Sequence, residues 1–246
     1  MGMMGDGYGS ECHLLRYLGR HRALLDQRVL EVTGATAIEW LDYPFDQRRT
    51  WQDGEWKGLD FVSDDAPAKV AWRRTWPQGR NAPNWDAIGR LRFGPGEAWL
   101  LVEAKANIEE LCSSCKASAH GGRPMVEAFL ARTRERLGVA ADHDWLSGYY
   151  QFCNRLAVLD LLNEHGAPAH LLNIYFVGDR SGPGRSCPQD VAAWEPALSA
   201  MEEHVGLARE HRLAGRAHKL FLPACDEGGV QVTTKKDTAG REAAAA

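Results

Sequence analysis

Three ionisable residues, Asp86, Glu103 and Lys105, have the types and spacing needed for metal-dependent chemistry on a phosphate. Two carboxylates held close together repel one another in a dry environment unless a cation neutralises them. Carboxylate oxygens suit Mg²⁺ or Mn²⁺, and such an ion can bind a phosphate oxygen and lower the pKa of an attacking water. A neighbouring lysine could orient that water or stabilise the negative charge that develops. This chemistry requires elements that bring the three side chains together.

The segments that carry these residues are predicted to form a β-hairpin. Residues 85–93 (WDAIGRLRF) and 98–106 (AWLLVEAKA) have the composition of strands, and the GPGE sequence between them is typical of a turn. A symmetric hairpin centred between Pro95 and Gly96 gives the pairs Phe93–Ala98, Ile88–Glu103 and Asp86–Lys105. Cross-strand partners and residues two apart share a face. This register therefore predicts that Asp86, Glu103 and Lys105 project from one side of the hairpin.

The other predicted elements follow from the spacing of apolar residues. Helical periodicity recurs at 11–31, 126–138, 145–166 and 188–211, and the stop signals are Gly34, Gly138 and Gly166. Strand-like segments lie at 37–44 and 170–179. Residues 46–80 are predicted to be an irregular connection that contains one short strand at 59–63 (LDFVS). This order predicts an α/β domain with a mixed central sheet flanked by helices.

The composition is that of one globular domain. The chain has 246 residues, of which 44% are hydrophobic and 25% charged. We expect a single domain over 1–225 and a disordered tail over 226–246, which lacks a core-forming pattern. No apolar run reaches the roughly 20 residues of a membrane span, and MGMMGDGYGS at the start lacks the pattern of a signal peptide. A cytoplasmic protein without a membrane partner is therefore expected.

Charge and cysteine content narrow the function classes. The net charge of −4 argues against a protein that coats nucleic acid non-specifically, but it does not exclude an enzyme whose metal ligands are acidic. The six scattered cysteines are expected to be reduced thiols. Cys112, Cys115 and His120 lack the second ligand pair of a zinc site. Structural thiols are the favoured interpretation, and a redox role is the alternative.

The aspartate, the hairpin and the Glu-x-Lys sequence at the end of an apolar strand resemble the PD-(D/E)xK nuclease superfamily. Its core has the order helix, three strands, helix, strand (αβββαβ), and the predicted order over residues 11–177 is similar. WDAIGRL, WLLVEAKA and WLSGYYQFCNRLA look most like uncharacterised bacterial proteins related to restriction endonucleases. The proline of the superfamily name is replaced by Trp85. The resemblance implies a restriction-endonuclease-like core followed by a C-terminal helical extension at about 188–222.

The resemblance also implies roles for individual residues. Asp86 and Glu103 would be ligands of Mg²⁺ or Mn²⁺, Ala104 would contribute a main-chain carbonyl, and Lys105 would be the catalytic lysine. The first helix of these enzymes often supplies a further acid. Three candidates stay open at this point: Glu11, Glu31 and Glu39.

Gln151 lies on the predicted helix 145–166, where some branches of the superfamily place a Gln/Tyr motif beside the active site. Tyr149, Tyr150 and Asn154 accompany it, and a role in the core or in capping is weighed equally with a role in the site. Several arginines could contact phosphates, although arginines on helices and loops are usually only solvated: Arg16, Arg20, Arg22, Arg73 and Arg74. The histidines His204, His211 and His218 show no metal-ligand spacing, and most are expected to be surface or interface residues.

Three function classes remain, and a nuclease is the leading one. The alternative is a nuclease-fold protein that no longer cleaves and serves as a nucleic-acid-binding or assembly module. A metal-dependent hydrolase of another substrate is a third, weaker hypothesis. The leading hypothesis is a Mg²⁺-dependent nuclease, expected to act on DNA, that hydrolyses a phosphodiester by water attack at a metal held by Asp86 and Glu103. A homodimer stays open, because restriction-type enzymes are often dimers.

Overall fold

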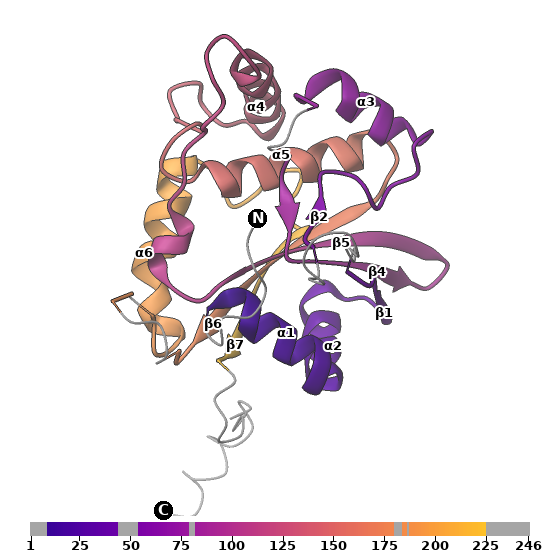
Figure 1. Ribbon diagram of the computed structural model, residues 1–246, viewed down its shortest axis with the longest axis vertical. Helices are drawn as coiled ribbons and strands as arrows, with labels where there is room; N and C mark the ends of the chain where they lie inside the picture. Colours follow the sequence, from indigo (N-terminus) through magenta and orange to yellow (C-terminus); the bar gives the residue numbers. More distant parts are fainter. Residues whose placement is uncertain (1–8, 44–53, 79–81, 180–183, 186, 225–246) are drawn as a thin grey trace, which may run out of the picture.

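The computed structural model describes residues 9–43, 54–78, 82–179, 184–185 and 187–224. In this part of the chain a central sheet has helices on both faces (Figure 1). Its five strands lie in the order β1-β4-β5-β6-β7. They are β1 (Ala37–Trp40), β4 (Ala87–Phe93), β5 (Gly96–Lys105), β6 (Ala169–Val177) and β7 (Ala217–Pro223). Because β1, β4 and β5 pair antiparallel while β5, β6 and β7 run parallel, the predicted mixed α/β sheet is confirmed.

Two helical layers cover the sheet. One face carries α1 (Ser10–Arg20) and α2 (Arg22–Thr33). The other carries α3 (Pro67–Thr75), α4 (Arg123–Leu137), α5 (Tyr150–Glu164) and α6 (Val191–Val205). Successive strand residues alternate between two apolar clusters: Leu100 and Val102 pack under α1 and α2, and Leu101 packs under α5. None of the described helices is long and apolar enough to cross a membrane.

The helix predicted at 11–31 is in fact two helices. His21 lies between α1 and α2, and its φ of −119° and ψ of 30° are not helical. The His21 N–H still donates to the carbonyls of Arg16 and Tyr17, so the bend leaves this backbone donor satisfied. The apolar spacing runs through the bend, which is why it predicted one helix. The predicted end at Gly34 is confirmed by its left-handed φ of 72°.

The hairpin forms as predicted, but its register differs by two residues. Phe93 pairs with Gly96, so that Gly94 and Pro95 alone make the turn. A two-residue turn favours a positive φ at its first central position, which Gly94 supplies at 58°, and the fixed φ of proline suits the second. The predicted pairs Phe93–Ala98, Ile88–Glu103 and Asp86–Lys105 are therefore wrong. A shift of two residues nevertheless keeps every strand residue on its predicted face.

The connection at 46–80 contains more regular structure than predicted. Residues 59–63 form turns rather than the expected strand. Instead, β2 (Trp56–Lys57) pairs with β3 (Asn84–Trp85), and the nine-residue helix α3 begins with Pro67 at its first position. Trp72 of α3 stacks on Trp76 with ring centroids 4.9 Å apart. The strand predicted to end at Pro44 ends at Trp40, and Pro44 itself lies outside the described residues.

The later helices and β6 lie close to their predicted positions, whereas β7 was not predicted. α4 ends at Gly138 and α5 ends just before Gly166, both with left-handed φ. α6 is shorter than the helix predicted at 188–211. β7 lies in the extension at 188–222 that was expected to be helical, and it pairs with β6 as the last strand of the sheet. The predicted tail at 226–246 lies outside the described residues.

A histidine pair joins β6 to β7 near the first residues of both strands. His170 Nδ1 lies 2.9 Å from His218 Nε2, and the two ring planes differ by only 6°. Burial, and then the neighbouring His218 and Arg216, lower the pKa of His170 from its ordinary 6.5 to about 4. Burial also lowers the pKa of His218. Both imidazoles are therefore neutral at neutral pH.

This pair makes the stability of the fold sensitive to acid. Because the pKa of His170 is lower in the folded state, its contribution is fully present above pH 6.5 and is lost as the pH falls towards 4. We expect the thermal unfolding midpoint of the wild type to fall more between pH 7 and pH 5 than that of His170→Gln. Replacement of the exposed His120 by Gln is the control and should leave the wild-type pH dependence. Parallel curves for wild type and His170→Gln would contradict the prediction.

Candidate active site

Glu103 and Lys105 are near the end of β5 and face α5. They continue the alternation that places Leu101 under that helix. Only 6% of the Glu103 side chain and 13% of the Lys105 side chain are exposed. Charged groups at the end of an apolar strand are costly to bury unless they are paired. The helix above supplies these partners.

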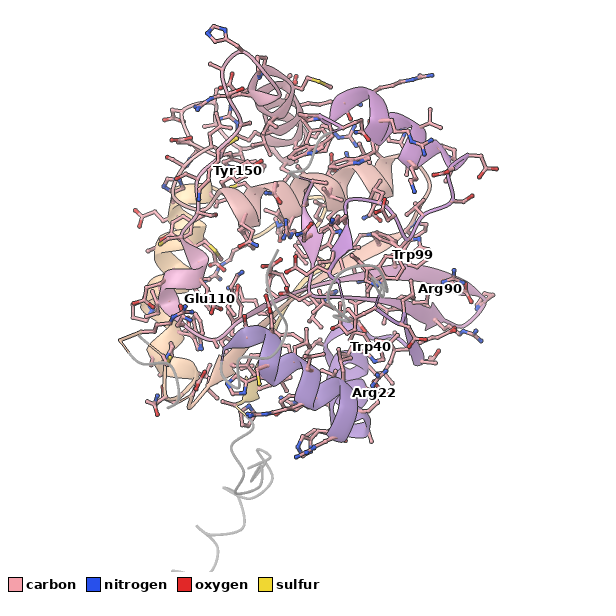
Figure 2. The ribbon with its side chains drawn as sticks, viewed as in Figure 1. Arg22, Trp40, Arg90, Trp99, Glu110 and Tyr150 are labelled. Carbon is pink, nitrogen blue, oxygen red and sulfur yellow. The ribbon has the colours of Figure 1, made fainter. Side chains whose placement is uncertain are left out.

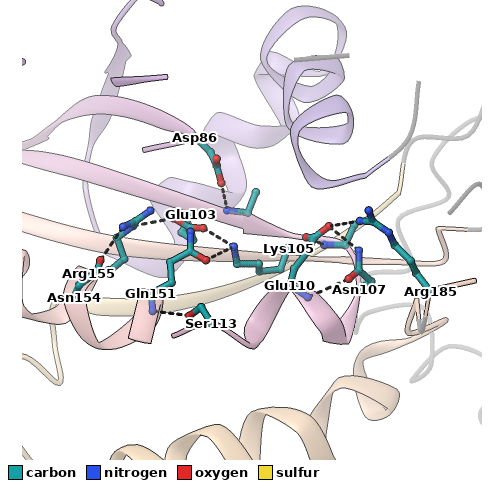
Figure 3. Close-up of polar contacts among 12 residues, drawn as sticks. Asp86, Glu103, Lys105, Asn107, Glu110, Ser113, Gln151, Asn154, Arg155 and Arg185 are labelled. Atoms are coloured by element: carbon teal, nitrogen blue, oxygen red, sulfur yellow. Dashed lines mark hydrogen bonds and ion pairs between the residues drawn. The ribbon is translucent and has the colours of Figure 1, made fainter. Parts of the chain in front are cut away.

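Each carboxylate oxygen of Glu103 is held by a different cation. Lys105 Nζ lies 2.5 Å from Oε1, and Arg155 Nε donates to Oε2 at 2.9 Å. Lys105 also donates to Gln151 Oε1 at 3.0 Å (Figure 3). Gln151 and Arg155 are four residues apart on α5, so they lie on one face of the helix. The structure thus brings the predicted Glu103, Lys105 and Gln151 together and adds Arg155.

The charges in this network stabilise one another. Burial alone would raise the pKa of Glu103, but Arg155 and Lys105 outweigh it and hold the pKa below its usual value. Burial would likewise lower the pKa of Lys105, whereas Glu103 and then Asp86 raise it. At neutral pH Glu103 is therefore a carboxylate and Lys105 an ammonium. In this state Lys105 donates hydrogen bonds and does not act as a base.

Asp86 lies directly before β4 and does not share the face of Glu103 and Lys105. Its N–H donates to Val102 O at 3.1 Å, and its Oδ2 accepts from the Ala104 N–H at 2.7 Å. The carboxylate is thus held beside the backbone of β5, apart from the group under α5 (Figure 3). The predicted common face is correct for Glu103 and Lys105 and wrong for Asp86, because a residue outside the strand need not follow its alternation.

The Asp86 carboxyl is in an unfavourable electrostatic environment. Burial, together with repulsion from Glu103, raises its pKa well above the usual value. Lys105 and the Ala104 N–H offset this shift in part, and Glu55 adds to it. A cation bound beside Asp86 would relieve the repulsion.

Asp86 is also part of a cluster of three acids. One carboxylate oxygen each of Glu11 on α1, Glu55 before β2 and Asp86 lies within 4.8 Å of the others. Asn84 Nδ2 donates to Glu55 Oε2 at 2.5 Å and orients that side chain. Among the described residues no other group of three or more acidic, histidine or cysteine side chains lies close enough to hold a metal ion.

Of the three candidates for the further acid, only Glu11 belongs to the acidic cluster. Glu11 joins Asp86, so the first helix supplies an acid. Glu31 instead pairs with Arg28 on the surface of α2, at 3.0 Å. Glu39 is an exposed residue of β1, 4.0 Å from Arg92. Neither Glu31 nor Glu39 belongs to the acidic cluster.

The Ala104 carbonyl is directed to the Asp86 side of β5. Val102 O accepts from Asp86 N, so the backbone polar groups of Val102 point towards β4. Alternate residues of a strand present their N–H and C=O groups to the same edge. Ala104 therefore presents both groups towards Asp86, and its N–H already bonds there. This direction suits the main-chain ligand role implied for Ala104.

Two residues of the site, Arg155 and Glu55, were missed in the sequence. Arg155 follows Gln151 by four positions in a predicted helix, and that spacing was a usable signal. Its guanidinium also packs over the Trp85 ring, with 4.8 Å from Cζ to the ring centroid, and it is 4% exposed. Glu55 lies in the segment predicted to be irregular, where no periodicity places a side chain.

Other candidate residues have structural contacts. Ser113, between Cys112 and Cys115, accepts a hydrogen bond from Gln151 N at 2.7 Å and so caps α5 beside the site. Neither cysteine belongs to a metal-binding group among the described residues. Burial raises the pKa of Tyr150 above its usual value. Figure 2 shows Arg22 beside Trp40, where its Cζ lies 5.7 Å from the ring centroid.

The site therefore has two halves that meet at Asp86 and the end of β5. One half is a carboxylate cluster, and the other is an ammonium held by Glu103 and Gln151. Comparison of the chain with models of known families, with curated proteins and with solved structures finds no match.

Proposed function

We propose that the chain is a metal-dependent nuclease of the PD-(D/E)xK type that hydrolyses phosphodiester bonds, with DNA as the expected substrate. One observation carries the proposal: three carboxylates within 4.8 Å of one another lie beside a buried ammonium at the end of β5. An all-oxygen ligand set is the chemistry that Mg²⁺ and Mn²⁺ prefer. An ammonium beside such a set is placed to act on the charge of a phosphate.

The arrangement of elements supports the family proposal. If β2, α3, β3, the short 3-10 helix after β5 and α4 are left out, the chain order up to β6 is α1 and α2, β1, β4, β5, α5, β6. This is the order helix, three strands, helix, strand that the resemblance implies for a restriction-endonuclease-like core. Glu103 and Lys105 lie at the end of the hairpin strand β5, as in the Glu-x-Lys motif.

The residues present fit a divalent cation. Glu11, Glu55 and Asp86 would hold it through the acidic cluster. The resemblance adds Glu103 and the Ala104 carbonyl as ligands, although Glu103 lies outside the cluster and is paired with Lys105 and Arg155. A bound Mg²⁺ or Mn²⁺ would polarise the phosphate and favour ionisation of the attacking water. The raised pKa of Asp86 shows that this carboxyl lies where extra positive charge would be favourable.

The chain's own groups would position the reactants. Lys105, protonated at neutral pH, donates hydrogen bonds and can orient the water or stabilise the charge that develops on the phosphate. Gln151 Oε1 accepts from Lys105 and limits the directions in which its ammonium can point. Arg155 fixes Glu103 through Oε2, which leaves Oε1 as the oxygen shared with Lys105.

The direct test is cleavage by the purified full chain. Supercoiled plasmid, single-stranded DNA and RNA are incubated with Mg²⁺, with Mn²⁺ and with excess EDTA. Cleavage of DNA that needs the metal and stops with EDTA is expected. Equal cleavage in EDTA would contradict the mechanism. Metal binding without cleavage of any substrate would favour the non-cleaving, nucleic-acid-binding alternative.

Metal affinity should depend on the acidic cluster. Glu11→Gln and Glu55→Gln each remove one anionic ligand, so calorimetry should show Mn²⁺ affinity reduced by about 10- to 100-fold. Glu31→Gln changes an acid of the same type on α2, outside the cluster, and should retain wild-type affinity. Equal effects of Glu11→Gln and Glu31→Gln would show that the titration reports surface charge and not this site.

A further inference from the structure

A small cavity adjoins the network of Glu103, Lys105 and Gln151. Its volume, measured as the space open to a water-sized sphere, is about 20 Å³. Its polar lining also includes Asn173, and its apolar wall includes Leu111, Phe152 and Met201. A cavity needs about 10–15 Å³ of such space and two to four polar partners to hold one water. This cavity therefore has the size and lining of a single-water site.

Asn173 is a polar residue in an apolar strand. It is the register partner of Glu103 on β6, so its side chain faces α5. The residue is 6% exposed, and every residue of β6 from Ala169 to Phe176 is buried. None of the side-chain hydrogen bonds found among the described residues involves its amide, and the amide is not one of their fully buried, unpartnered polar groups. Its polar atoms therefore reach the space of the cavity that Asn173 lines, and a water there can serve as their partner.

The same cavity borders the ammonium of Lys105. That group has three N–H donors, and two of its acceptors are Glu103 Oε1 and Gln151 Oε1. A water in the cavity can accept from Lys105 and donate to the Asn173 carbonyl oxygen. Such a water would link the lysine to β6 as well as to α5.

We propose that Asn173 is a positioning residue for Lys105 and acts through one water held in this cavity. The inference rests on the proposed function, because it assigns a further residue to the same site. If Glu103 contributed to a metal site, Lys105 would share that acceptor with the ion. Gln151 and the water bound by Asn173 then hold the ammonium in place. Asn173 itself does not touch the substrate.

The first test replaces Asn173 by Leu, which keeps a similar volume and removes the amide. The thermal midpoint should be unchanged or raised, because a buried polar group without a protein partner is removed. At saturating substrate kcat should fall by about 10- to 100-fold, the scale of a misplaced catalytic group. The KM and the Mn²⁺ Kd should stay at wild-type values. A purely structural asparagine would not produce this separation of kcat from KM.

Two further variants sharpen this test. Asn173→Ser keeps a hydrogen-bonding group and leaves room for water, so it should recover part of the lost kcat. Glu97→Gln changes an exposed residue near the other end of β5, away from the cavity, and it should cleave at the wild-type rate. Wild-type kcat in Asn173→Leu would overturn the inference while leaving the proposed nuclease function intact.

A structural readout separates the two proposals. High-resolution crystal structures of the wild type and of Asn173→Leu, both without metal, should show a water bonded to Asn173 and Lys105 in the first and none in the second. A dry cavity in the wild type would overturn the inference. If the wild type cleaves no nucleic acid, the proposed function fails, and the presence of this water still decides whether Asn173 holds Lys105.

Discussion

Lys105→Ala is expected to lower the rate of metal-dependent DNA cleavage at saturating substrate by about 100- to 1,000-fold, the range found for removing a donor that stabilises developing negative charge. The reason is geometric, because Lys105 is the ammonium that the structure holds between Glu103 and Gln151 at the acidic cluster. Its raised pKa keeps it charged at neutral pH. The measurement is a single-turnover cleavage assay with Mn²⁺.

Two controls make this result specific. Mn²⁺ binding by Lys105→Ala, followed by calorimetry, should be retained, since the variant removes no metal ligand. Lys219→Ala removes an exposed lysine of β7, which pairs with Glu202 at the surface, and it should cleave at the wild-type rate. Undiminished cleavage by Lys105→Ala would show that the catalytic centre lies elsewhere in the chain.

Arg155→Met is expected to destabilise the fold by about 3–5 kcal/mol, the cost of removing one partner of a buried ion pair. Arg155 is 4% exposed and holds Glu103 Oε2 at 2.9 Å, so its loss leaves a buried carboxylate with Lys105 as its remaining cation. Methionine keeps much of the volume, and the effect therefore reports the charge. Urea unfolding of the metal-free protein at neutral pH is the measurement.

A second substitution tests the cause of this destabilisation. Glu103→Gln removes the carboxylate charge that Arg155 no longer neutralises. The double variant Glu103→Gln/Arg155→Met should therefore be more stable than Arg155→Met alone. Arg123→Met breaks an exposed pair with Glu127 on α4 and should leave the free energy of unfolding nearly unchanged. A double variant no more stable than Arg155→Met would mean that lost packing over Trp85, and not charge, dominates.

The sequence predicted the parts of the site that local rules determine. The β-hairpin and the common face of Glu103 and Lys105 follow from alternation along one strand, which a two-residue error in register does not disturb. Gln151 was placed by a family resemblance, and α5 does bring it to Lys105. These features depend on neighbours in sequence or on a short motif.

The features of the site and the fold that the sequence did not predict depend on contacts between distant segments. Glu55 reaches Asp86 because β2 pairs with β3, and neither two-residue strand has a periodic pattern. Asp86 lies just before β4, and its side chain is oriented by a hydrogen bond from the Ala104 N–H of β5. The bend at His21 interrupts a helix whose apolar spacing continues through it. Such features follow from tertiary packing, which one sequence does not reveal.

Glu103 is bound by Lys105 through one carboxylate oxygen and by Arg155 through the other, and this arrangement affects how the molecule would respond to a bound ion. The same carboxylate anchors α5 through Arg155 and would contribute to the metal site, so helix docking and metal occupancy draw on one group. Binding equilibria that share a group are coupled, and the coupling is reciprocal. The metal affinities of the docked and the open helix should therefore differ by the same factor by which the metal changes the opening equilibrium of that helix. The helix would then act as a sensor of the ion.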